Sequence, residues 1–369
     1  MIGTEHEYSI NDSRFNPLPV SDQIIRTICG RYESEILFGE AKLGKELQKT
    51  VIEFVPRSPA NDITSLEAQI VQGIGKFHTI FRDQYTLLGL GMHPLAVPAD
   101  IPVWDHDEGE YYEVYHRLFN IRQHGWLNIQ ALQVNLSYRT DRELVALYNR
   151  LRCLLPYLIA VTASSPMVEG RLTGSCDNRL IYYQKNQEEI PLICNRIIPE
   201  PIRSVADYRA MQGKIFRELR LRDAGILCEE WVNSGGIIIR FSRKCIEIKA
   251  LDEQESVRSD MAVCAFIRAL LRCRSLPVVT DQDTLLDLTA TAIRGGTAGL
   301  RPELEALYGR ALAHATPEEK RYLPVIADRI RSGSLAELMQ DRIRNDRSVL
   351  PVLGDMARCL RENRSYRGS

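Results

Sequence analysis

Hydrophobic and polar positions alternate with period two in several stretches of this chain, and this pattern predicts β-strands there. The stretches are residues 1–10, 48–56, 126–139 and 235–252, and the last contains a turn around Arg243 that indicates a hairpin. Residues 87–100 are predicted to begin as an apolar strand and to continue into a proline-rich loop.

Apolar residues spaced three and four apart predict helices between these strands. The predicted helices cover 21–32 with Ser21 as the cap, 61–89 with a start near Asp62 or Thr64, 110–123, and 141–164. From about residue 255 to the end the pattern is mostly helical, with glycine and proline between the helices. Hairpins mixed with helices, without regular βαβ alternation, favour an α+β fold with an antiparallel sheet.

The polar faces of the predicted strands carry mostly acids and amides. These positions are Glu5, Glu7, Glu53, Gln133, Asn135, Glu247 and Lys249. Clustered carboxylates on an apolar framework repel one another, and burying an isolated one costs several kcal/mol unless it is paired or bound to a cation. Mg²⁺ or Mn²⁺ relieves that repulsion through oxygen ligands, so the pattern predicts an acidic metal cup. The alternative is that each acid is an ordinary solvated or salt-bridged residue.

Glu46 is a weaker candidate for this cup. It lies seven residues before Glu53 and therefore has opposite parity in a strand. It joins the cup only from the preceding turn or across a bulge.

Composition excludes several classes of protein. The 47 Lys and Arg residues nearly cancel the 48 Asp and Glu residues, which argues against a general nucleic-acid or anionic-membrane binder. Nine scattered cysteines without a C-x-x-C motif indicate free thiols in a reducing cytoplasm. The N-terminus lacks a cationic-then-apolar leader, and no apolar run approaches the ~18–20 residues that span a bilayer. We therefore expect a cytoplasmic protein with small-molecule partners.

Four stretches together resemble the glutamate–cysteine ligase family, in particular its second type, which includes other carboxylate–amine ligases. GTEHEYSI is similar to an N-terminal G-x-E-x-E strand, and GKELQKTVIEFVPRSP to an E-x(6)-E segment. TASSPMVEGRLTGSCDNRL is similar to the family's A-S-S-P…G-R-x-T-G…S-x-R segment, and GGIIIRFSRKCIEIKALD to its arginine–glutamate hairpin. No glycine-rich phosphate loop of the G-x-G-x-x-G or G-x-x-x-x-G-K-[ST] type follows a predicted strand.

This resemblance implies a glutamine-synthetase-like fold, with ATP and Mg²⁺ bound over a curved antiparallel sheet that is backed by helices. It also implies that ATP phosphorylates a substrate carboxylate and that an amine, cysteine or another, then displaces the phosphate to give an amide. The implied metal ligands are Glu5, Glu7, Glu46, Glu53, Gln133 and Glu247. The implied catalytic residues are Glu53, Arg179 and Arg240, and the implied nucleotide-binding residues are Asn135, Arg171, Arg179, Arg240 and Lys249.

One departure from the family pattern leaves other functions open. Gln133 stands where many members carry a histidine ligand, and its neutral oxygen is a weaker ligand for Mg²⁺. A catalytically impaired nucleotide- or amino-acid-binding relative is therefore one alternative. A metal-dependent hydrolase is another, although the chain has only seven histidines.

Three further segments are interpreted from the sequence. His93 either lines the funnel or is a strand-end histidine before a turn. Residues 104–111, WDHDEGEY, are expected to form a mobile lid. Residues 1–300 are predicted to form the catalytic domain, and the helical extension 301–369 either covers the back of the sheet or makes a contact in a homo-oligomer.

Overall fold

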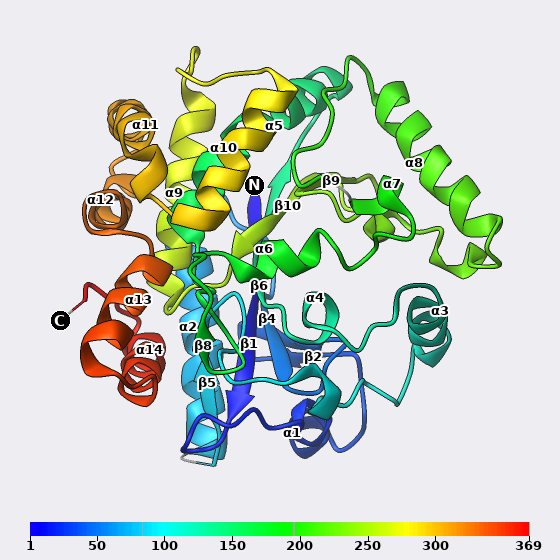
Figure 1. The fold of residues 1–369 in the computed structure, drawn as a ribbon, viewed down its shortest axis with the longest axis vertical. Helices are drawn as coiled ribbons and strands as arrows, with labels where there is room; N and C mark the ends of the chain where they lie inside the picture. Colours follow the sequence, from blue (N-terminus) through cyan, green and yellow to red (C-terminus); the bar gives the residue numbers. More distant parts are fainter. Residues whose placement is uncertain (83, 195, 369) are drawn as a thin grey trace.

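The computed structural model describes residues 1–82, 84–194 and 196–368. An eight-stranded sheet lies at the centre, with strands in the order β2-β3-β4-β1-β6-β10-β9 and with β5 paired to β1 beside this path (Figure 1). The named pairs of this sheet are antiparallel, which confirms the predicted fold class. The strands are β1 Ile2–Asn11, β2 Glu35–Phe38, β3 Ala41–Lys45, β4 Val51–Pro56, β5 Thr86–Leu88, β6 Ala131–Ser137, β9 Ile237–Arg240 and β10 Cys245–Asp252.

A short separate hairpin and the helices complete the described fold. The hairpin pairs β7 Met167–Val168 with β8 Arg171–Leu172. The helices are α1 Ser21–Cys29, α2 Ile63–Phe81, α3 Gly109–Phe119, α4 His124–Leu127, α5 Asp141–Thr162, α6 Asn178–Tyr183, α7 Pro191–Cys194, α8 Val205–Arg220, α9 Val257–Arg272, α10 Gln282–Gly295, α11 Arg301–His314, α12 Leu323–Ser332, α13 Leu335–Asp346 and α14 Leu350–Glu362.

One face of the sheet is apolar and packs against helices α2, α5 and α9. Tyr8, Val134 and Ile248 lie on this face and are fully buried with apolar residues of the three helices. Because side chains alternate along a strand, the intervening polar positions project from the opposite face. The alternation read from the sequence therefore decides which face carries the core.

Side-chain caps explain where two of the long helices begin. Asp62 accepts a hydrogen bond from the backbone N–H of Ser65 at 2.8 Å, and Thr140 accepts one from Glu143 at 3.2 Å. The predicted start of α2 near Asp62 and of α5 near Asp141 is thus confirmed. Ser21 does not cap α1 as predicted, because it is the first helical residue and Val20 at the cap position makes no side-chain bond.

Several predicted boundaries were wrong where short elements follow one another. The hairpin β2–β3 was missed, since β2 has only four residues. The helix predicted over 61–89 ends at Phe81, where Arg82 adopts a φ of 47°, and residues 86–88 form β5. The strand predicted over 126–139 is shorter, because α4 occupies its first residues.

Helix α5 corrects an expectation about apolar length. It has 22 residues and a mean hydropathy of 1.4 over its most apolar window, so by length and composition it could cross a membrane. However, 72% of that window is buried inside the protein. Its apolar residues belong to the same buried cluster as the sheet, which makes it a core helix.

The C-terminal helices pack against the rest of the fold. Figure 1 shows α11 to α14 gathered along one side of the molecule, with α3 and α8 on the other side and the sheet between them. Helices α11 and α12 contact α9, and α14 contacts β5. Leu304 and Leu307 of α11 belong to the main apolar core, so the C-terminal helices cover the helices that pack on the sheet. The predicted domain boundary at residue 300 stays a prediction.

We expect Gly91→Ala to destabilise the protein by about 1–3 kcal/mol, because overpacking a filled site costs that much. A Cβ at Gly91 would lie 2.1 Å from Cγ of the buried Asp252. Urea unfolding measures the loss. Gly213→Ala is the matched control, since nothing lies within 4 Å of a Cβ at that exposed position of α8. The control should instead gain roughly 0.5–1 kcal/mol. Equal effects of both substitutions would contradict the close packing at Gly91.

Candidate active site

The polar face of the sheet forms one wall of a cavity of about 480 Å³. Nine residues proposed from the sequence line it: Glu5, Glu7, Glu46, Glu53, Gln133, Arg179, Arg240, Glu247 and Lys249. They come from strands β1, β4, β6, β9 and β10, from helix α6, and from the connection that follows β3.

Strand register brings these side chains together. Glu7 of β1 lies directly opposite Glu53 of β4, and Glu5 lies opposite Gln133 of β6. On the other side of β6, Asn135 lies opposite Glu247 of β10. Directly opposed residues project from the same face of a sheet. Four strands therefore aim acids and amides in the same direction.

Glu46 reaches the cavity by one of the two routes that the sequence left open. It follows Lys45, the last residue of β3, and so lies in the turn that leads to β4. Because Glu46 lies in the turn and Glu53 lies in β4, the two residues do not share one strand. Their spacing along the chain therefore does not determine which face each side chain occupies.

Three of the acids form a carboxylate triad (Glu7, Glu46 and Glu53). One oxygen of each lies within 4.8 Å of the others. In the part of the chain that the structure describes, none of the three has a Lys or Arg within ion-pair distance. Glu7 accepts hydrogen bonds from the Gln133 side chain at 2.9 Å and from the Ala131 backbone at 2.8 Å. The triad thus gathers three carboxyl groups without a basic partner.

Burial raises the pKa of each carboxyl group of the triad, and repulsion from neighbouring glutamates adds to the effect. The pKa of Glu7 rises to about 7 and the pKa of Glu46 to about 8. The pKa of Glu53 rises well above its usual range, through burial and then through the charges of Glu5 and Glu46. The bonds from Gln133 and Ala131 act in the opposite direction on Glu7. A bound cation would remove this repulsion.

The remaining two acids are paired with a basic wall (Arg240, Arg243 and Lys249). Arg240 donates to Glu247 at 2.6 Å, and the Lys249 ammonium lies 3.8 Å from the same carboxylate. Arg243 donates to Glu5 at 2.9 Å. The sequence placed Arg243 only in a turn and proposed Glu5 and Glu247 as metal ligands. In the structure both of these acids are neutralised by the basic wall, and among the acids proposed from the sequence only the three of the triad have no Lys or Arg partner within the described residues.

Gln133 and Arg179 act through hydrogen bonds to neighbouring acids. Gln133, proposed as a metal ligand, turns its NH₂ group toward Glu7. Arg179 donates through Nε to Asp252 at 2.6 Å and through a terminal nitrogen to the backbone oxygen of Lys249 at 3.2 Å. Asp252 in turn accepts from the hydroxyl of Ser165 at 2.8 Å. These contacts fix a buried arginine at the edge of the cavity.

An aromatic wall opposite the sheet was missed by the sequence reasoning. Tyr112 and Tyr115 of α3, Trp126, and Trp231 line the cavity. The Tyr115 ring centroid lies 4.8 Å from that of Trp126 and 6.1 Å from that of Trp231. The spacing of tyrosines in residues 111–115 was a visible signal of one aromatic face on the predicted helix. Only the tertiary structure shows that this face borders the acids.

The segment 104–111 is not a free lid in this structure. Lys49 pairs with Asp105 at 2.6 Å, and Ser34 donates to Asp107 at 2.6 Å. His106 stacks on Tyr32 with ring centroids 3.7 Å apart. These contacts hold the segment against the connections that precede β2 and β4, so Asp105 and Asp107 are paired rather than simply solvated.

Three other candidates lie outside the main cavity. Arg171 is exposed on the β7–β8 hairpin, and it is absent from the described lining of the cavity. Asn135 donates to Glu5 at 3.1 Å and lines an adjoining, mainly apolar cavity of about 380 Å³. His93 is buried and lies 2.7 Å from the Asn11 side-chain oxygen, which favours the interpretation as a structural histidine.

Sequence comparison identifies relatives along the whole chain. A model of the glutamate-cysteine ligase family 2 (GCS2) matches residues 1–349. An uncharacterized protein of Archaeoglobus fulgidus is 46% identical over 370 residues, which cover 99% of this chain and 100% of that protein. A putative glutamate–cysteine ligase 2 of Rhodopirellula baltica is 26% identical over 279 residues, covering 73% of this chain and 68% of the relative.

Two solved structures share the fold. The bifunctional glutathione synthetase of Pasteurella multocida superposes with a TM-score of 0.68 and 13% identity over 98% of this chain, which spans 52% of that longer protein. The glutamate–cysteine ligase of Francisella tularensis, solved in complex with AMP, gives a TM-score of 0.64 and 14% identity, covering 99% of this chain and 89% of the other. These similarities confirm the ligase-type fold that the residue pattern implied.

We expect the stability of the metal-free protein to fall as the pH rises from about 5 to about 8. The folded pKa values of Glu7 and Glu46, about 7 and about 8, lie above the unfolded value of about 4.3, so the folded state binds more protons in this window. Urea midpoints measured in EDTA across this range test the trend. Glu46→Gln should flatten the slope, because glutamine does not titrate, and Mg²⁺ should flatten it by relieving the repulsion.

The control for this experiment is Glu305→Gln on the exposed surface of α11, which should leave the slope unchanged. A metal-free protein whose stability rises between pH 5 and 8 would contradict the inferred protonation of the triad.

Proposed function

The chain belongs to glutamate-cysteine ligase family 2, and we propose that it is an ATP-dependent ligase that joins a carboxylate to an amine through an acyl phosphate. The observation that carries this proposal is one sheet face on which three cation-free carboxylates adjoin three basic side chains. Phosphoryl transfer requires charge neutralisation and positioning more than covalent help from the protein. The carboxylates would bind a neutralising cation, and the basic side chains would bind phosphate oxygens.

The carboxylate triad fits Mg²⁺. Its donors are oxygens and its side chains are partly or fully buried. Burial and mutual repulsion raise its pKa values, and a divalent cation would relieve that repulsion. Glu7, Glu46 and Glu53 would therefore hold the ion. Bound Mg²⁺ supplies neutralisation of phosphate oxygens. Glu5, Glu247 and Gln133, the other ligands proposed from the sequence, would join only by exchanging their present hydrogen-bond partners.

The basic wall and the second cavity fit a nucleotide. Arginine forks and a lysine ammonium suit phosphate oxygens, and Arg240, Arg243 and Lys249 lie together beside the triad. The adjoining cavity shares Glu5 and Arg243 with the main one and is lined by apolar residues that include Ile2, Val55 and Pro59. We place the base in this apolar cavity and the phosphates along the basic wall.

The proposed reaction has two steps. A substrate carboxylate oxygen attacks the γ-phosphorus and the bond to the β-phosphate oxygen breaks, which gives an acyl phosphate and ADP. The nitrogen of an amine then attacks the acyl carbon, loses a proton and expels phosphate, leaving an amide. In this scheme Arg240 and Arg179 neutralise the charge that develops on the transferred group, and the aromatic wall excludes water from the intermediate.

The two alternatives have less support from the site. A metal-dependent hydrolase would be favoured by histidine ligands, whereas the described lining of the cavity contains none. An impaired relative would not need to keep an unneutralised triad beside three basic residues, since such clustering destabilises the fold. Glutamate with cysteine, or with another amine, is the proposed substrate pair. The nine free cysteines agree with the cytoplasm as the proposed compartment.

ADP release against a panel of amino acids, supplied as carboxylate donors and as amine acceptors, tests the proposed reaction. We expect at least one pair to stimulate release in a Mg²⁺-dependent manner. Glu53→Gln and Arg240→Ala should each lower stimulated turnover by at least about 10²-fold, because each removes charge that the transferred phosphate requires.

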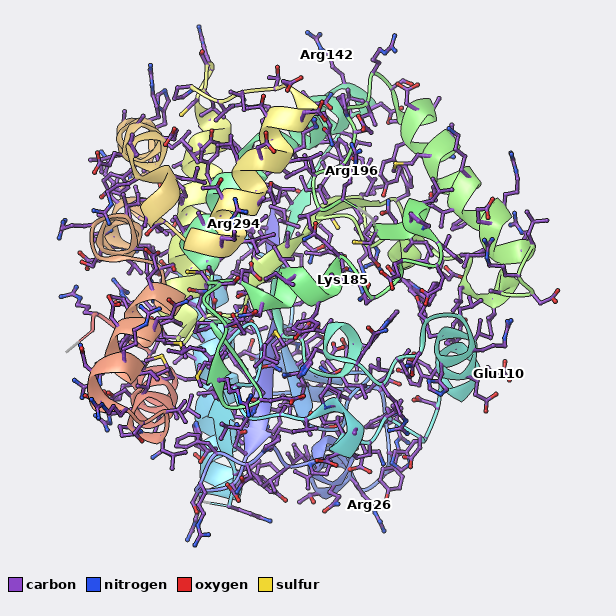
Figure 2. All side chains as sticks on the ribbon, viewed as in Figure 1. Arg26, Glu110, Arg142, Lys185, Arg196 and Arg294 are labelled. Carbon is purple, nitrogen blue, oxygen red and sulfur yellow. The ribbon has the colours of Figure 1, made fainter. Side chains whose placement is uncertain are left out.

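The matched control for these variants is Arg142→Ala, which removes a cation at the periphery of the molecule (Figure 2). Its turnover should stay within about twofold of the wild type. All three variants should keep a cooperative thermal transition. If no substrate pair stimulates ADP release, the ligase proposal fails.

Thermal unfolding with ligands separates the alternatives without knowledge of the substrates. We expect ATP with Mg²⁺ to stabilise the protein by about 2.7 kcal/mol at 100 times the dissociation constant. Mg²⁺ with inorganic phosphate should give a smaller shift. A hydrolase would respond to the metal irrespective of adenine, and an inert fold would respond to neither.

A further inference from the structure

A second cluster of ligand-type side chains lies on the helix-facing side of β1 and is named here the rear cluster (His6, Glu253 and Asp260). His6 lies between Glu5 and Glu7 and therefore points away from the cavity. Glu253 follows β10, and Asp260 lies in the first turn of α9. All three side chains are fully buried. The proposed ligase reaction does not use them.

The distances within the rear cluster match those between ligands of one small cation. Nδ1 of His6 lies 3.2 Å from Oδ2 of Asp260 and 3.5 Å from Oε1 of Glu253. Ligands held about 2.0–2.1 Å from a tetrahedral Zn²⁺ are separated by ~3.4 Å. One imidazole nitrogen with two carboxylate oxygens is also a donor set that suits zinc.

The charges of the rear cluster need protons or a cation to balance. When both are ionised, Glu253 and Asp260 place two negative charges in a fully buried site, and within the described residues neither is paired with Lys or Arg. The nearby Glu255 takes up Arg329, to which it binds at 2.7 Å. A protonated imidazole leaves one excess negative charge, which a proton on Glu253 would also remove, since burial raises the pKa of that carboxyl group well above its usual range. A divalent cation with a neutral imidazole leaves none, which avoids the cost of a buried net charge.

Several buried oxygens around the cluster make no hydrogen bond of ordinary geometry to the described residues. Oε1 of Glu253, Oδ1 of Asp260 and the hydroxyl of Tyr8 are buried without a hydrogen-bond partner in the described chain. Burial raises the pKa of Tyr8, and the charges of Glu253 and Asp260 and a side-chain contact with Glu253 raise it further, so the Tyr8 hydroxyl lies next to these acids. Buried polar atoms are nearly always partnered in native proteins. Three orphaned oxygens around one histidine are therefore informative.

The contacts behind the histidine fit a metal ligand. Nε2 of His6 lies 2.9 Å from the Thr4 hydroxyl, to which it can donate its proton and so leave Nδ1 as a lone-pair donor. Glu253 also accepts from the backbone N–H of Glu7 at 3.1 Å through its other oxygen. The rear cluster is thus connected directly to the backbone that carries the carboxylate triad.

We propose that His6, Glu253 and Asp260 form a closed structural site for one divalent transition cation, Zn²⁺ by donor set and spacing, with Tyr8 beside it. The site joins β1, the end of β10 and α9 at one point. It differs from the carboxylate triad in two ways that can be measured, because it contains a nitrogen donor and is sealed from solvent. Its cation therefore resists chelators as long as the protein stays folded.

Metal analysis of the native chain tests the site. The protein is expressed without a polyhistidine tag in medium supplemented with zinc, manganese and iron, and is dialysed against EDTA before mass spectrometry of the metals. We expect about one equivalent of zinc to remain in the folded protein and to be released in denaturant with EDTA. Less than about 0.1 equivalent of retained transition metal overturns the proposal and assigns the charge balance to protons.

X-ray absorption of the retained metal locates it without any variant. We expect one imidazole nitrogen among oxygen ligands, whereas a spectrum of oxygen ligands alone would place the metal in the triad and overturn the proposal. This measurement also separates the rear cluster from the proposed function, because loss of ligase activity would not change it.

Three variants confirm the location. Asp260→Asn should lower retained zinc at least tenfold. His106→Gln, at the partly exposed group of Asp22, Asp105 and His106, and Glu46→Gln in the triad should both retain it. Retention by Asp260→Asn, or loss in His106→Gln, overturns the assignment. If Asp260→Asn does not fold, the absorption spectrum of the native protein together with zinc retention by His106→Gln decides.

Discussion

Repulsion between carboxylates that strand pairing places face to face is the constraint on which this structure depends. Glu7 and Glu53 are directly opposed in register, and Glu46 joins them from the adjoining turn. Charges of one sign at this distance and burial destabilise the fold unless protons or a cation neutralise them. The same repulsion gives the site its affinity for a divalent cation. Stability and the proposed function are therefore coupled at the triad.

The surroundings of the triad determine which acids are available. Asn135, Arg240, Arg243 and Lys249 contact Glu5 and Glu247, so two of the five acids proposed for this face already have partners. Asp252 holds Arg179 in turn, and the close approach of Gly91 leaves Asp252 little freedom. The result is a graded site, with a cation-free acidic side next to a basic wall. Such an arrangement suits a metal and a polyanion bound side by side.

Strand β1 has chemistry on both of its faces. Glu5 and Glu7 face the cavity, whereas His6 faces the helices and meets Glu253 and Asp260. Because Glu253 accepts a hydrogen bond from the backbone of Glu7, the rear cluster restrains the strand that carries Glu7 of the triad. The residues of β1 that line the cavity and the residue of β1 that joins the rear cluster are therefore neighbours in the chain.

The sequence by itself determined much of the fold class and much of the site. Period-two alternation identified Glu5, Glu7, Glu53, Gln133 and Glu247 as one polar set, because the direction of a side chain from a strand is a local property. Helix α2 was placed to within one residue at its start by Asp62, since capping is also local. The short β2–β3 hairpin was missed because four or five residues carry little periodic signal.

Only the tertiary structure decided which residues each acid contacts. The pairing of Glu5 with Arg243, the aromatic wall of α3, the position of Arg171 outside the cavity and the meeting of His6 with Asp260 all join residues far apart in the chain. Such contacts depend on strand order and register. Alternation within one strand says which way a side chain points but not what it meets, because its partners come from whichever strands and helices pack beside it.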